Sequence, residues 1–197
     1  EQGKRLNQDF LFRRSKKITT EMEEKYNLHK AQREKITPDM PIKKVDPSGD
    51  IKRQVANAVK MVGMRYKFQT LGEYNAVLSL YNIRCEQTDG RVNGREYHGL
   101  VYFATDDEGK VIANPFKASR LGKFASRTAI DSRFEKAKDK IDVAPTRRRV
   151  AEVLARATDK DDFTAKLKDR GIDVVFRYTD EGRIYGVTFI DHNTMTV

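Results

Sequence analysis

Basic residues in two short stretches are the side chains of this sequence best suited to chemistry, and that chemistry is the binding of anions. One stretch follows an apolar segment, and the other lies near a predicted helix start, where the helix dipole gives cations no help. Cations and hydroxyls are the side chains that most often contact phosphate. The candidate nucleic-acid-binding residues are Lys117, Ser119, Arg120, Lys123, Arg127, Arg147 and Arg148. A solvated surface without a ligand is the alternative for both stretches.

Three tyrosines lie on or near predicted strands. Tyr97, Tyr102 and Tyr185 could stack on unpaired bases, because every base offers a flat π face to an aromatic ring. Burial against a covering helix is the competing explanation, and it is the one we favour for Tyr102.

Residue types of enzyme active sites and metal centres occur without the required spacing. His29, His98 and His192 are far apart, and none has a neighbour at the spacing of metal ligands. The acidic run 106–108 suits a hairpin turn, and both glycine-rich phosphate-binding motifs are missing from the sequence. We therefore expect no catalytic residue, no metal site and no cofactor within these residues.

The overall composition favours an anionic partner. Lys and Arg number 39 against 29 Asp and Glu, which gives a net charge of +10. Such an excess is typical of proteins that bind nucleic acid or a membrane surface, and a merely soluble basic protein is the alternative. No apolar run approaches the roughly 20 residues of a membrane-spanning helix, so we expect no membrane partner.

The single cysteine and the first residue indicate the setting of the chain. Cys85 cannot form an internal disulfide and lies among apolar residues, which predicts a small buried side chain in a reducing compartment, the cytoplasm. The sequence lacks an initiator Met, and we expect a fragment of a longer protein.

The element that must position the first basic stretch is a predicted β-hairpin. Residues 100–104 carry apolar side chains on both faces, residues 107–110 supply a turn, and a return strand follows from Val111. A glycine-rich loop is expected before it, over residues 88–95. Residues 117–123, here called the basic segment, are expected to leave the hairpin as a loop and open a helix.

Helical periodicity and capping residues predict the remaining elements. An N-terminal helix runs from a cap at Ser15 to Tyr26, and a Pro-containing linker follows over residues 33–50. Asp50 and Thr70 are expected to cap the next two helices. The other helices are expected at residues 51–66, 71–81, 124–140, 144–157 and 161–170, and the other strands at 83–87, 172–178, 183–190 and 194–197.

The two halves of the sequence match each other. Tyr74, Leu78, Asn82 and Ile83 correspond to Phe163, Leu167, Gly171 and Ile172, and residues 99–103 correspond to 186–190 after a small shift. Each copy is a helix, a residue suited to the left-handed conformation, a strand and a hairpin. The second copy lacks a counterpart of the basic segment, and we expect the parent protein to continue with one. Chance similarity between two ordinary helix–strand units is the alternative.

These patterns together predict an α+β fold. It consists of two repeated helix–strand–hairpin units with small antiparallel sheets covered by helices, plus an N-terminal helix and linker. The expected divisions are residues 1–50 for the N-terminal helix and linker, 51–142 for the first unit with its flanking helices, and 143–197 for the second unit, truncated at its C-terminal hairpin.

Short motifs in both parts of the chain resemble the relaxase, or mobilisation nuclease, proteins of conjugative and mobilisable bacterial elements. Residues 14–18 (Arg-Ser-Lys-Lys-Ile) and 23–28 (Glu-Glu-Lys-Tyr-Asn-Leu) resemble the segment just downstream of the nuclease core, with Asn in place of the usual Gly. Residues 171–174 (Gly-Ile-Asp-Val) and 186–189 (Gly-Val-Thr-Phe) resemble its repeated unit. Residues 119–123 (Ser-Arg-Leu-Gly-Lys) resemble the motif that closes this unit.

The resemblance implies a DNA strand-nicking parent protein, in which a tyrosine attacks the phosphodiester and a histidine cluster binds a divalent metal. The His-x-His motif of that core is missing here, so its catalytic residues are expected before residue 1 and this chain is expected not to be an enzyme. We expect a non-catalytic accessory region that binds DNA, single-stranded, during plasmid or transposon transfer in the bacterial cytoplasm. The alternative is a protein-interaction module recognised by a coupling protein or an auxiliary mobilisation protein.

Overall fold

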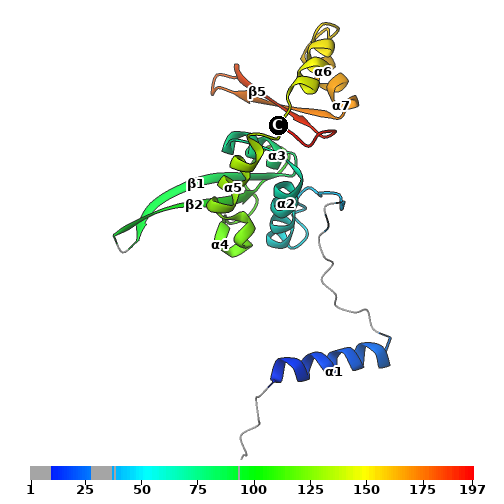
Figure 1. Ribbon diagram of the computed structural model, residues 1–197, viewed down its shortest axis with the longest axis vertical. Helices are drawn as coiled ribbons and strands as arrows, with labels where there is room; N and C mark the ends of the chain where they lie inside the picture. Colours follow the sequence, from blue (N-terminus) through cyan, green and yellow to red (C-terminus); the bar gives the residue numbers. More distant parts are fainter. Residues whose placement is uncertain (1–9, 28–36, 38, 93) are drawn as a thin grey trace, which may run out of the picture. The chain divides into compact units, whose positions relative to one another are not determined.

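The computed structural model describes residues 10–27, 37, 39–92 and 94–197. Helices and two small antiparallel sheets follow one another along the chain (Figure 1), which confirms the predicted α+β fold. The chain divides into two compact units, Glu1–Lys35 and Ile36–Val197.

Helix α1 (Leu11–Lys25) is the described helix of the first unit. It begins upstream of the predicted cap at Ser15, because the Arg and Lys residues around that serine are good helix formers and extend the helix to a cap at Phe10. Asn27 adopts the left-handed conformation, with φ 49°, that ends many helices. The predicted linker over 33–50 lies partly outside the described residues.

Helices α2 (Ile51–Arg65) and α3 (Leu71–Ser79) begin at the predicted caps. The side chains of Asp50 and Thr70 each accept a hydrogen bond from the first turn of the helix that follows. The Glu73 carboxylate accepts in turn from the backbone N–H of the residue before Thr70, at 2.6 Å. These bonds satisfy N–H groups that a helix start leaves without partners.

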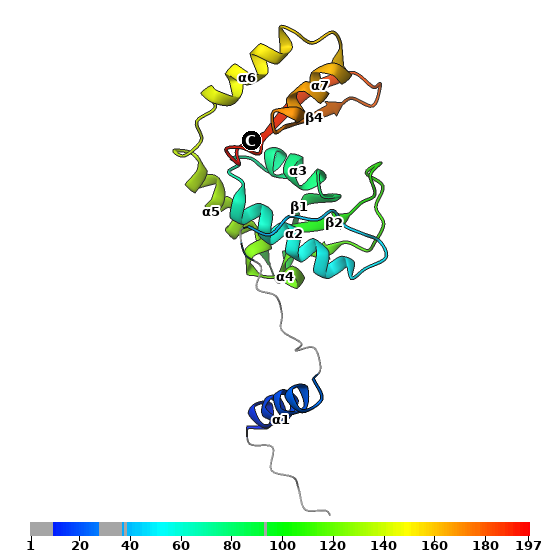
Figure 2. The ribbon, with the colours of Figure 1, turned by 90° about the vertical axis from the view of Figure 1, so that its right-hand side faces the viewer.

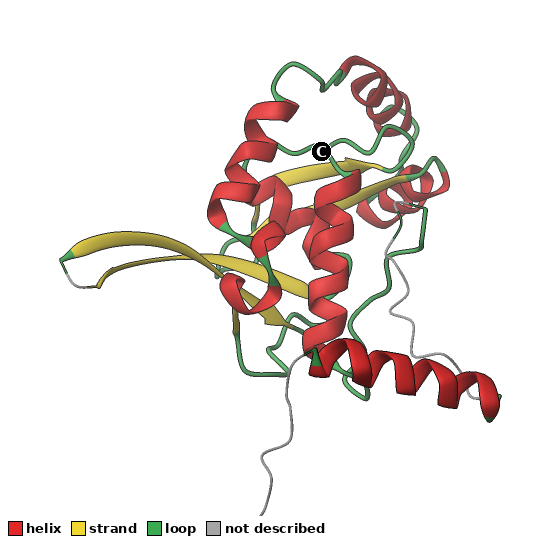
Figure 3. Cartoon of the chain, turned by 60° about the horizontal axis from the view of Figure 1, so that its bottom comes forward, coloured by secondary structure: helices red, strands yellow, loops and turns green. Residues whose placement is uncertain are grey.

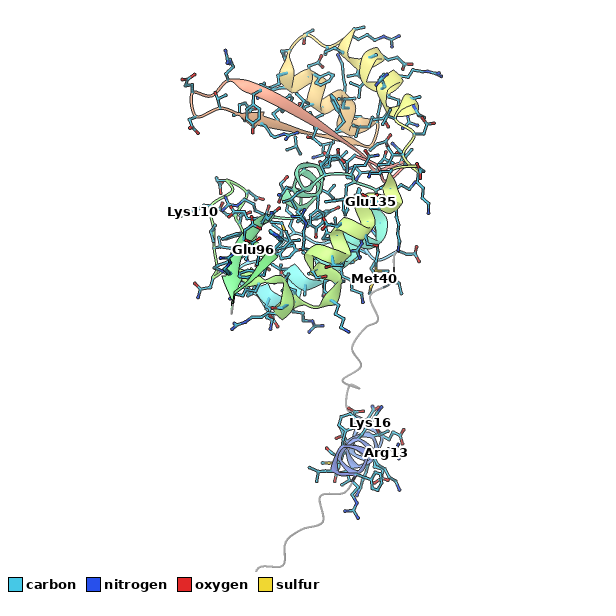
Figure 4. The ribbon with its side chains drawn as sticks, turned by 60° about the vertical axis from the view of Figure 1, so that its left-hand side comes forward. Arg13, Lys16, Met40, Glu96, Lys110 and Glu135 are labelled. Carbon is cyan, nitrogen blue, oxygen red and sulfur yellow. The ribbon has the colours of Figure 1, made fainter. Side chains whose placement is uncertain are left out.

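The first sheet contains β1 (Ile83–Val92), β2 (Arg95–Ala104) and β3 (Phe116–Lys117), in that order. β1 and β2 pair antiparallel over their full lengths. The far half of this hairpin, residues 88–92 and 94–99, projects beyond the helices as a curved arm (Figures 1 and 3), on which Figure 4 labels Glu96.

The prediction of a loop over residues 88–95 is wrong, because most of those residues belong to β1, which continues towards the tip of the arm. Tyr97 lies directly opposite Gly90, and its ring lies where a Cβ of Gly90 would stand. An aromatic ring laid over a strand glycine shields the exposed backbone and stabilises the extended conformation.

The prediction of a return strand that begins at Val111 is also wrong. Thr105 and Val111 form only an isolated bridge, and regular pairing with β2 resumes at Phe116. Pro115 accounts for part of the gap, since it has no N–H to donate to a ladder. The predicted turn is present, with Gly109 at φ 84°.

The basic segment forms a short helix where a loop was predicted. It comprises Lys117, α4 (Ala118–Leu121), Gly122 at φ 139° and the first residue of the 3-10 helix η1 (Lys123–Ala125). The helix predicted over 124–140 is interrupted, because Ser126 is extended and caps α5 (Arg127–Ala137).

The main core lies between the first sheet and helices α2, α3 and α5. Leu100 and Tyr102 enter it from β2, and Ile83 and Cys85 enter it from β1. Tyr102 is completely buried, and its hydroxyl donates to the Ala125 carbonyl at 2.8 Å. Burial raises the pKa of the Cys85 thiol to about 12, as expected for a cysteine that serves as a small core residue.

The second copy contributes its own sheet and a smaller core. Its elements are α6 (Ala144–Leu154), α7 (Lys160–Asp169), β4 (Ile172–Tyr178) and β5 (Ile184–Asp191). α7 covers one face of the β4–β5 hairpin through Phe163 and Leu167 (Figure 2). The opposite face joins the main core through Val175 and Ile190.

The internal repeat is visible in individual hydrogen bonds at the helix starts. Thr70 and Asp159 each cap their helix, α3 and α7, by accepting from the third residue that follows. Glu73 and Asp162 each accept from the N–H of the residue before the cap. The same pair of bonds therefore begins the helix of each copy.

The repeat continues through the helix ends and strands. Asn82 and Gly171, which follow the two helices, have φ values of 61° and 73°. Their carbonyls accept from the N–H groups of Thr105 and His192, both at 2.9 Å. Gly99 lies opposite Thr88 and Gly186 lies opposite Arg177, and each of these partners is the sixth residue after Asn82 or Gly171, so the two glycines are equivalent in the hairpins, as the sequence match predicts.

Residues 194–197 do not form the predicted strand along β5. Asp191 and Thr196 close a tight turn with two backbone hydrogen bonds, in which Met195 has φ 53°. The backbone of Lys67 donates to the Met195 carbonyl within that turn and accepts from the N–H of Val197 just after it. The end of the second copy is thereby joined to the segment between α2 and α3.

Replacing Gly171 by Ala should lower the free energy of unfolding by about 1–2 kcal/mol, the usual cost of a left-handed residue with a Cβ. The new Cβ would also lie 3.0 Å from the Asn193 side chain. Gly182→Ala is the matched control, because Gly182 has φ 81° but nothing within 4 Å. Urea unfolding should show a larger loss for Gly171→Ala; equal losses would mean that the contact with Asn193 is unimportant.

Candidate nucleic-acid interface

The basic segment lies at the outer edge of the first sheet. Lys117 belongs to the edge strand β3, while Ser119, Arg120 and Lys123 follow on α4 and η1. All four side chains are exposed, whereas Ala118, between the first two of them, is buried in the main core. Core packing therefore fixes this backbone and leaves its polar side chains in solvent.

The three cations of the basic segment have no carboxylate partner among the described residues. Ion pairs form elsewhere on the sheet and helices, but none includes Lys117, Arg120 or Lys123. An external anion would therefore meet these charges without first displacing a carboxylate of the described chain.

Arg127 differs from the basic segment. Its Nε lies 2.7 and 2.8 Å from the two carboxylate oxygens of Asp131, one helical turn later, and its Nη1 contacts the side-chain oxygen of Gln87. Asp131 orients the guanidinium from the same helix, and Gln87 attaches it to β1. The structure thus gives Arg127 a local role in holding α5 on β1.

The face of the first sheet away from the main core carries further aromatic and basic side chains. Val101 and Phe103 point to this face from β2, and Arg84 and Lys117 lie opposite them on the neighbouring strands. Val101 and Phe103 are partly exposed, and neither belongs to the main core or packs against it. We call Arg84, Val101, Phe103 and Lys117 the open face.

Arg84 and Phe103 are already stacked on the open face. The guanidinium carbon lies 4.9 Å from the ring centroid, within the range of a cation–π interaction. Glu86 pairs with Arg84 at 3.0 Å, so Lys117 supplies the unpaired positive charge of this face. A flat ring, a flat guanidinium and a nearby free cation are the groups that bind a base and its phosphate.

The three candidate tyrosines are in different surroundings. Tyr102 is buried in the main core, as we favoured. Tyr97 is 46% exposed on the arm, on the same sheet face as Phe103 but over Gly90. Tyr185 is 64% exposed on β5, in the other copy. Only Tyr97 therefore extends the aromatic surface of the open face.

In the second basic stretch, Arg149 pairs with a buried carboxylate of the same chain, Asp191. Asp191 has no exposed side-chain surface, and it accepts hydrogen bonds from Arg149 at 3.0 Å and from the Thr146 hydroxyl at 2.6 Å. Burial raises the pKa of Asp191, but these bonds and those from Asn193 outweigh it and lower the pKa overall. The charge of Arg149 is therefore neutralised within the fold, without an external anion.

Arg147 and Arg148 remain exposed on α6. α6 packs on α7, whereas α4 packs on α2, η1 and the first sheet. These two arginines and the basic segment therefore lie on different parts of the structure and do not form one continuous surface.

His192 connects the two copies through hydrogen bonds from both of its ring nitrogens. Its two ring nitrogens lie 2.7 Å from the Tyr66 hydroxyl and 2.8 Å from the Asp173 carboxylate. Burial raises the pKa of Tyr66, which keeps its hydroxyl protonated, and the bond to His192 lowers the pKa of Asp173. This geometry suits a structural link between the α2 end and the second hairpin.

The described residues contain neither a metal centre nor a membrane-spanning helix. Within those residues, no three His, Cys, Asp or Glu side chains lie close enough to hold a metal ion. No helix of the described chain combines the length and apolar character needed to cross a membrane.

No family model, curated protein or solved structure matches this chain. The resemblance to relaxases therefore depends on the short sequence motifs alone.

Sequence reasoning missed Arg84 and Phe103 as candidates. The alternation of Leu100, Val101, Tyr102 and Phe103 shows that β2 has two apolar faces, but the helices decide which face is covered. The signal that could have found them is position: residues opposite each other in an antiparallel pair share a face, and Arg84 lies opposite Phe103.

Proposed function

We propose that this chain binds single-stranded DNA with the open face and the basic segment. The observation that carries the proposal is their continuity at Lys117, which belongs to both surfaces. A strand laid across the sheet would place bases against Phe103 and Arg84 and phosphates beside Lys117, Arg120 and Lys123. The net charge of +10 would draw the polyanion to the chain from a distance.

Single-stranded DNA fits this surface better than a duplex. Stacking on an aromatic ring requires bases that are not enclosed in a double helix, and it tolerates any sequence because all bases have a π face. The Phe103 ring of the open face would have no binding partner in a complex that contacts phosphates alone. We therefore infer a preference for unpaired strands with weak sequence selectivity.

We propose further that this binding serves DNA transfer as the accessory region of a bacterial relaxase. The sequence motifs at residues 14–28 and 171–189 support this assignment. In that setting the chain would hold the strand near the nick, while the nicking chemistry and its metal would belong to the nuclease core.

Phe103→Ala should weaken binding of a fluorescent oligothymidine about 5- to 150-fold, since stacking contributes roughly 1–3 kcal/mol per base. Tyr185→Ala is the matched control, because Tyr185 is an exposed strand aromatic of the other copy. Fluorescence anisotropy at low salt measures both variants, and circular dichroism checks their folding. Equal binding by wild type and Phe103→Ala would reject stacking on the open face.

The alternative function, recognition by a coupling protein or an auxiliary mobilisation protein, has one observation in its favour. β5 has β4 on one side, and its other edge borders a cleft of about 400 Å³. Charge reversal in the basic segment would leave capture of such a partner intact, whereas it would abolish DNA binding.

A further inference from the structure

The open face continues from the body of the first sheet onto the arm. Successive side chains of a strand point to opposite faces, so every second residue of β2 from Phe103 back to Tyr97 lies on one side. On β1, Gly90 shares this side, because it pairs with Tyr97. One sheet face therefore joins the Phe103 ring to the Tyr97 ring.

The Tyr97 ring is held in place by the neighbouring strand. A Cβ built on Gly90 would lie 2.5 Å from a ring atom of Tyr97, so the ring occupies the space that a larger residue would fill. The tyrosine is nevertheless 46% exposed. An aromatic ring that is positioned before its ligand arrives loses little freedom on binding, which favours affinity.

Between the two rings the face is low. Gly99 has no side chain, and Thr88, its partner on β1, has a short one that ends in a hydroxyl. A Cβ on Gly99 would lie 3.1 Å from the Thr88 Oγ1, so the glycine keeps this stretch open. Such a stretch leaves room for a sugar–phosphate backbone, and hydroxyls are among the groups that contact phosphate.

The carboxylates of the arm lie on its other side. Asp89 and Glu96 alternate with the residues of the open side, and they lie opposite His98 and Arg91. Asp89 pairs with His98 at 2.6 Å, and Glu96 pairs with Arg91 at 3.3 Å. Among the described side chains of the arm, the open side therefore presents a ring and a hydroxyl, without a carboxylate that would repel a phosphate.

We propose that Tyr97 is a second stacking platform, and that a single strand bound to the open face runs along β2 from Phe103 to Tyr97. This inference rests on the proposed DNA binding and defines the ligand more closely. Each strand residue advances about 3.3 Å, so the two rings are separated by about 20 Å along β2. Lys117 lies opposite Val101, between the rings, where it would meet a phosphate of the strand.

The separation of the rings sets the length of DNA that can use both. Stacked bases rise about 3.4 Å per nucleotide. Three bases therefore cover about 7 Å, and less than 20 Å even when stretched to twice that rise. A trinucleotide reaches one ring at a time, whereas a strand of 12 nucleotides reaches both.

Oligothymidines of 12 and 3 nucleotides test the proposal by fluorescence anisotropy at low salt. Tyr97→Leu keeps an apolar side chain beside Gly90 but removes the π face. It should weaken binding of the 12-mer at least about fivefold and binding of the trinucleotide at most about twofold. Tyr97→Phe keeps the ring and should bind the 12-mer as wild type does. His98→Leu is the matched control, because His98 is exposed on the other side of the arm.

Fluorescence gives a readout that a purely structural role of Tyr97 would not change. The sequence contains no Trp, so Tyr97→Trp introduces a single indole. Stacking of a base should quench its emission when the 12-mer saturates the protein. His98→Trp, on the other side of the arm, should keep its emission. Circular dichroism checks the folding of all variants.

Three results would overturn the inference and leave DNA binding by the open face intact. The first is a loss of 12-mer affinity in Phe103→Ala but not in Tyr97→Leu. The second is an equal loss for both oligonucleotides in Tyr97→Leu, because the strand length would then be irrelevant. The third is unchanged emission of Tyr97→Trp at saturation. Failure of the wild-type chain to bind the 12-mer would instead reject the proposed function, and this inference with it.

Discussion

Changing Lys117, Arg120 and Lys123 together to Glu should reduce the affinity for single-stranded DNA at least about 100-fold at low salt. Hydrogen bonds to charged groups contribute roughly 1.5–3 kcal/mol each, and the substitution adds repulsion. The logarithm of the binding constant should also fall less steeply with the logarithm of salt concentration. Loss of three phosphate contacts to a single strand predicts a slope shallower by about 2. A salt titration by fluorescence anisotropy measures both quantities.

The control for this variant carries the same change in charge at another place. Lys136, Lys140 and Arg156 are exposed and lie outside the basic segment and the open face. Their triple change to Glu alters the net charge equally, so it should lower affinity only through the long-range field. If both triple variants lose affinity to the same extent, binding depends on net charge and the basic segment is not the site.

Asp191→Ala should lower the free energy of unfolding by about 2–4 kcal/mol, the usual effect of removing one partner from a buried charged network. The variant leaves Arg149 and Thr146 without their acceptor and takes two bonds from Asn193. α6 would lose its polar attachment to the end of β5. Chemical unfolding followed by circular dichroism measures the effect.

The pH dependence of the Asp191→Ala effect gives an independent check. Because the pKa of Asp191 is lowered in the folded chain, its stabilising contribution is present above the ordinary value of 3.8 and is lost as the pH falls below it. The difference between wild type and variant should therefore shrink in acid. Asp180→Ala, in the exposed β4–β5 turn, is the control and should change stability little at any pH. A difference that stays constant down to acid pH would contradict a charged, hydrogen-bonded Asp191.

Local features of the fold could be predicted from the sequence. The caps at Asp50 and Thr70 depend on residues within one helical turn, and the left-handed positions at Asn82 and Gly171 depend on a single residue type. The strand over 172–178 is bounded by Gly171 on one side and a turn on the other, and its observed limits equal the predicted ones.

Features that depend on distant contacts could not be predicted. Gly90 indicates a loop when taken alone, and only the ring of Tyr97 across the hairpin explains why it lies in a strand. The basic segment was recognisable from its spacing, but that its cations have no carboxylate partner among the described residues depends on the positions of the surrounding side chains. Arg149 shows the opposite outcome, since its partner Asp191 lies 42 residues away in sequence.

Aromatic residues occupy equivalent positions in the two copies, but those of the first copy are tyrosines and those of the second are phenylalanines. Tyr74 and Tyr102 bring their hydroxyls to 3.4 Å in the first copy, while Phe163 and Phe189 meet edge to face in the second. A nascent chain that exchanged one hairpin for the other would strand a tyrosine hydroxyl in an apolar interior and lose the acceptor at Ala125. The two hydroxyl groups therefore disfavour packing of either hairpin against the helix of the other copy.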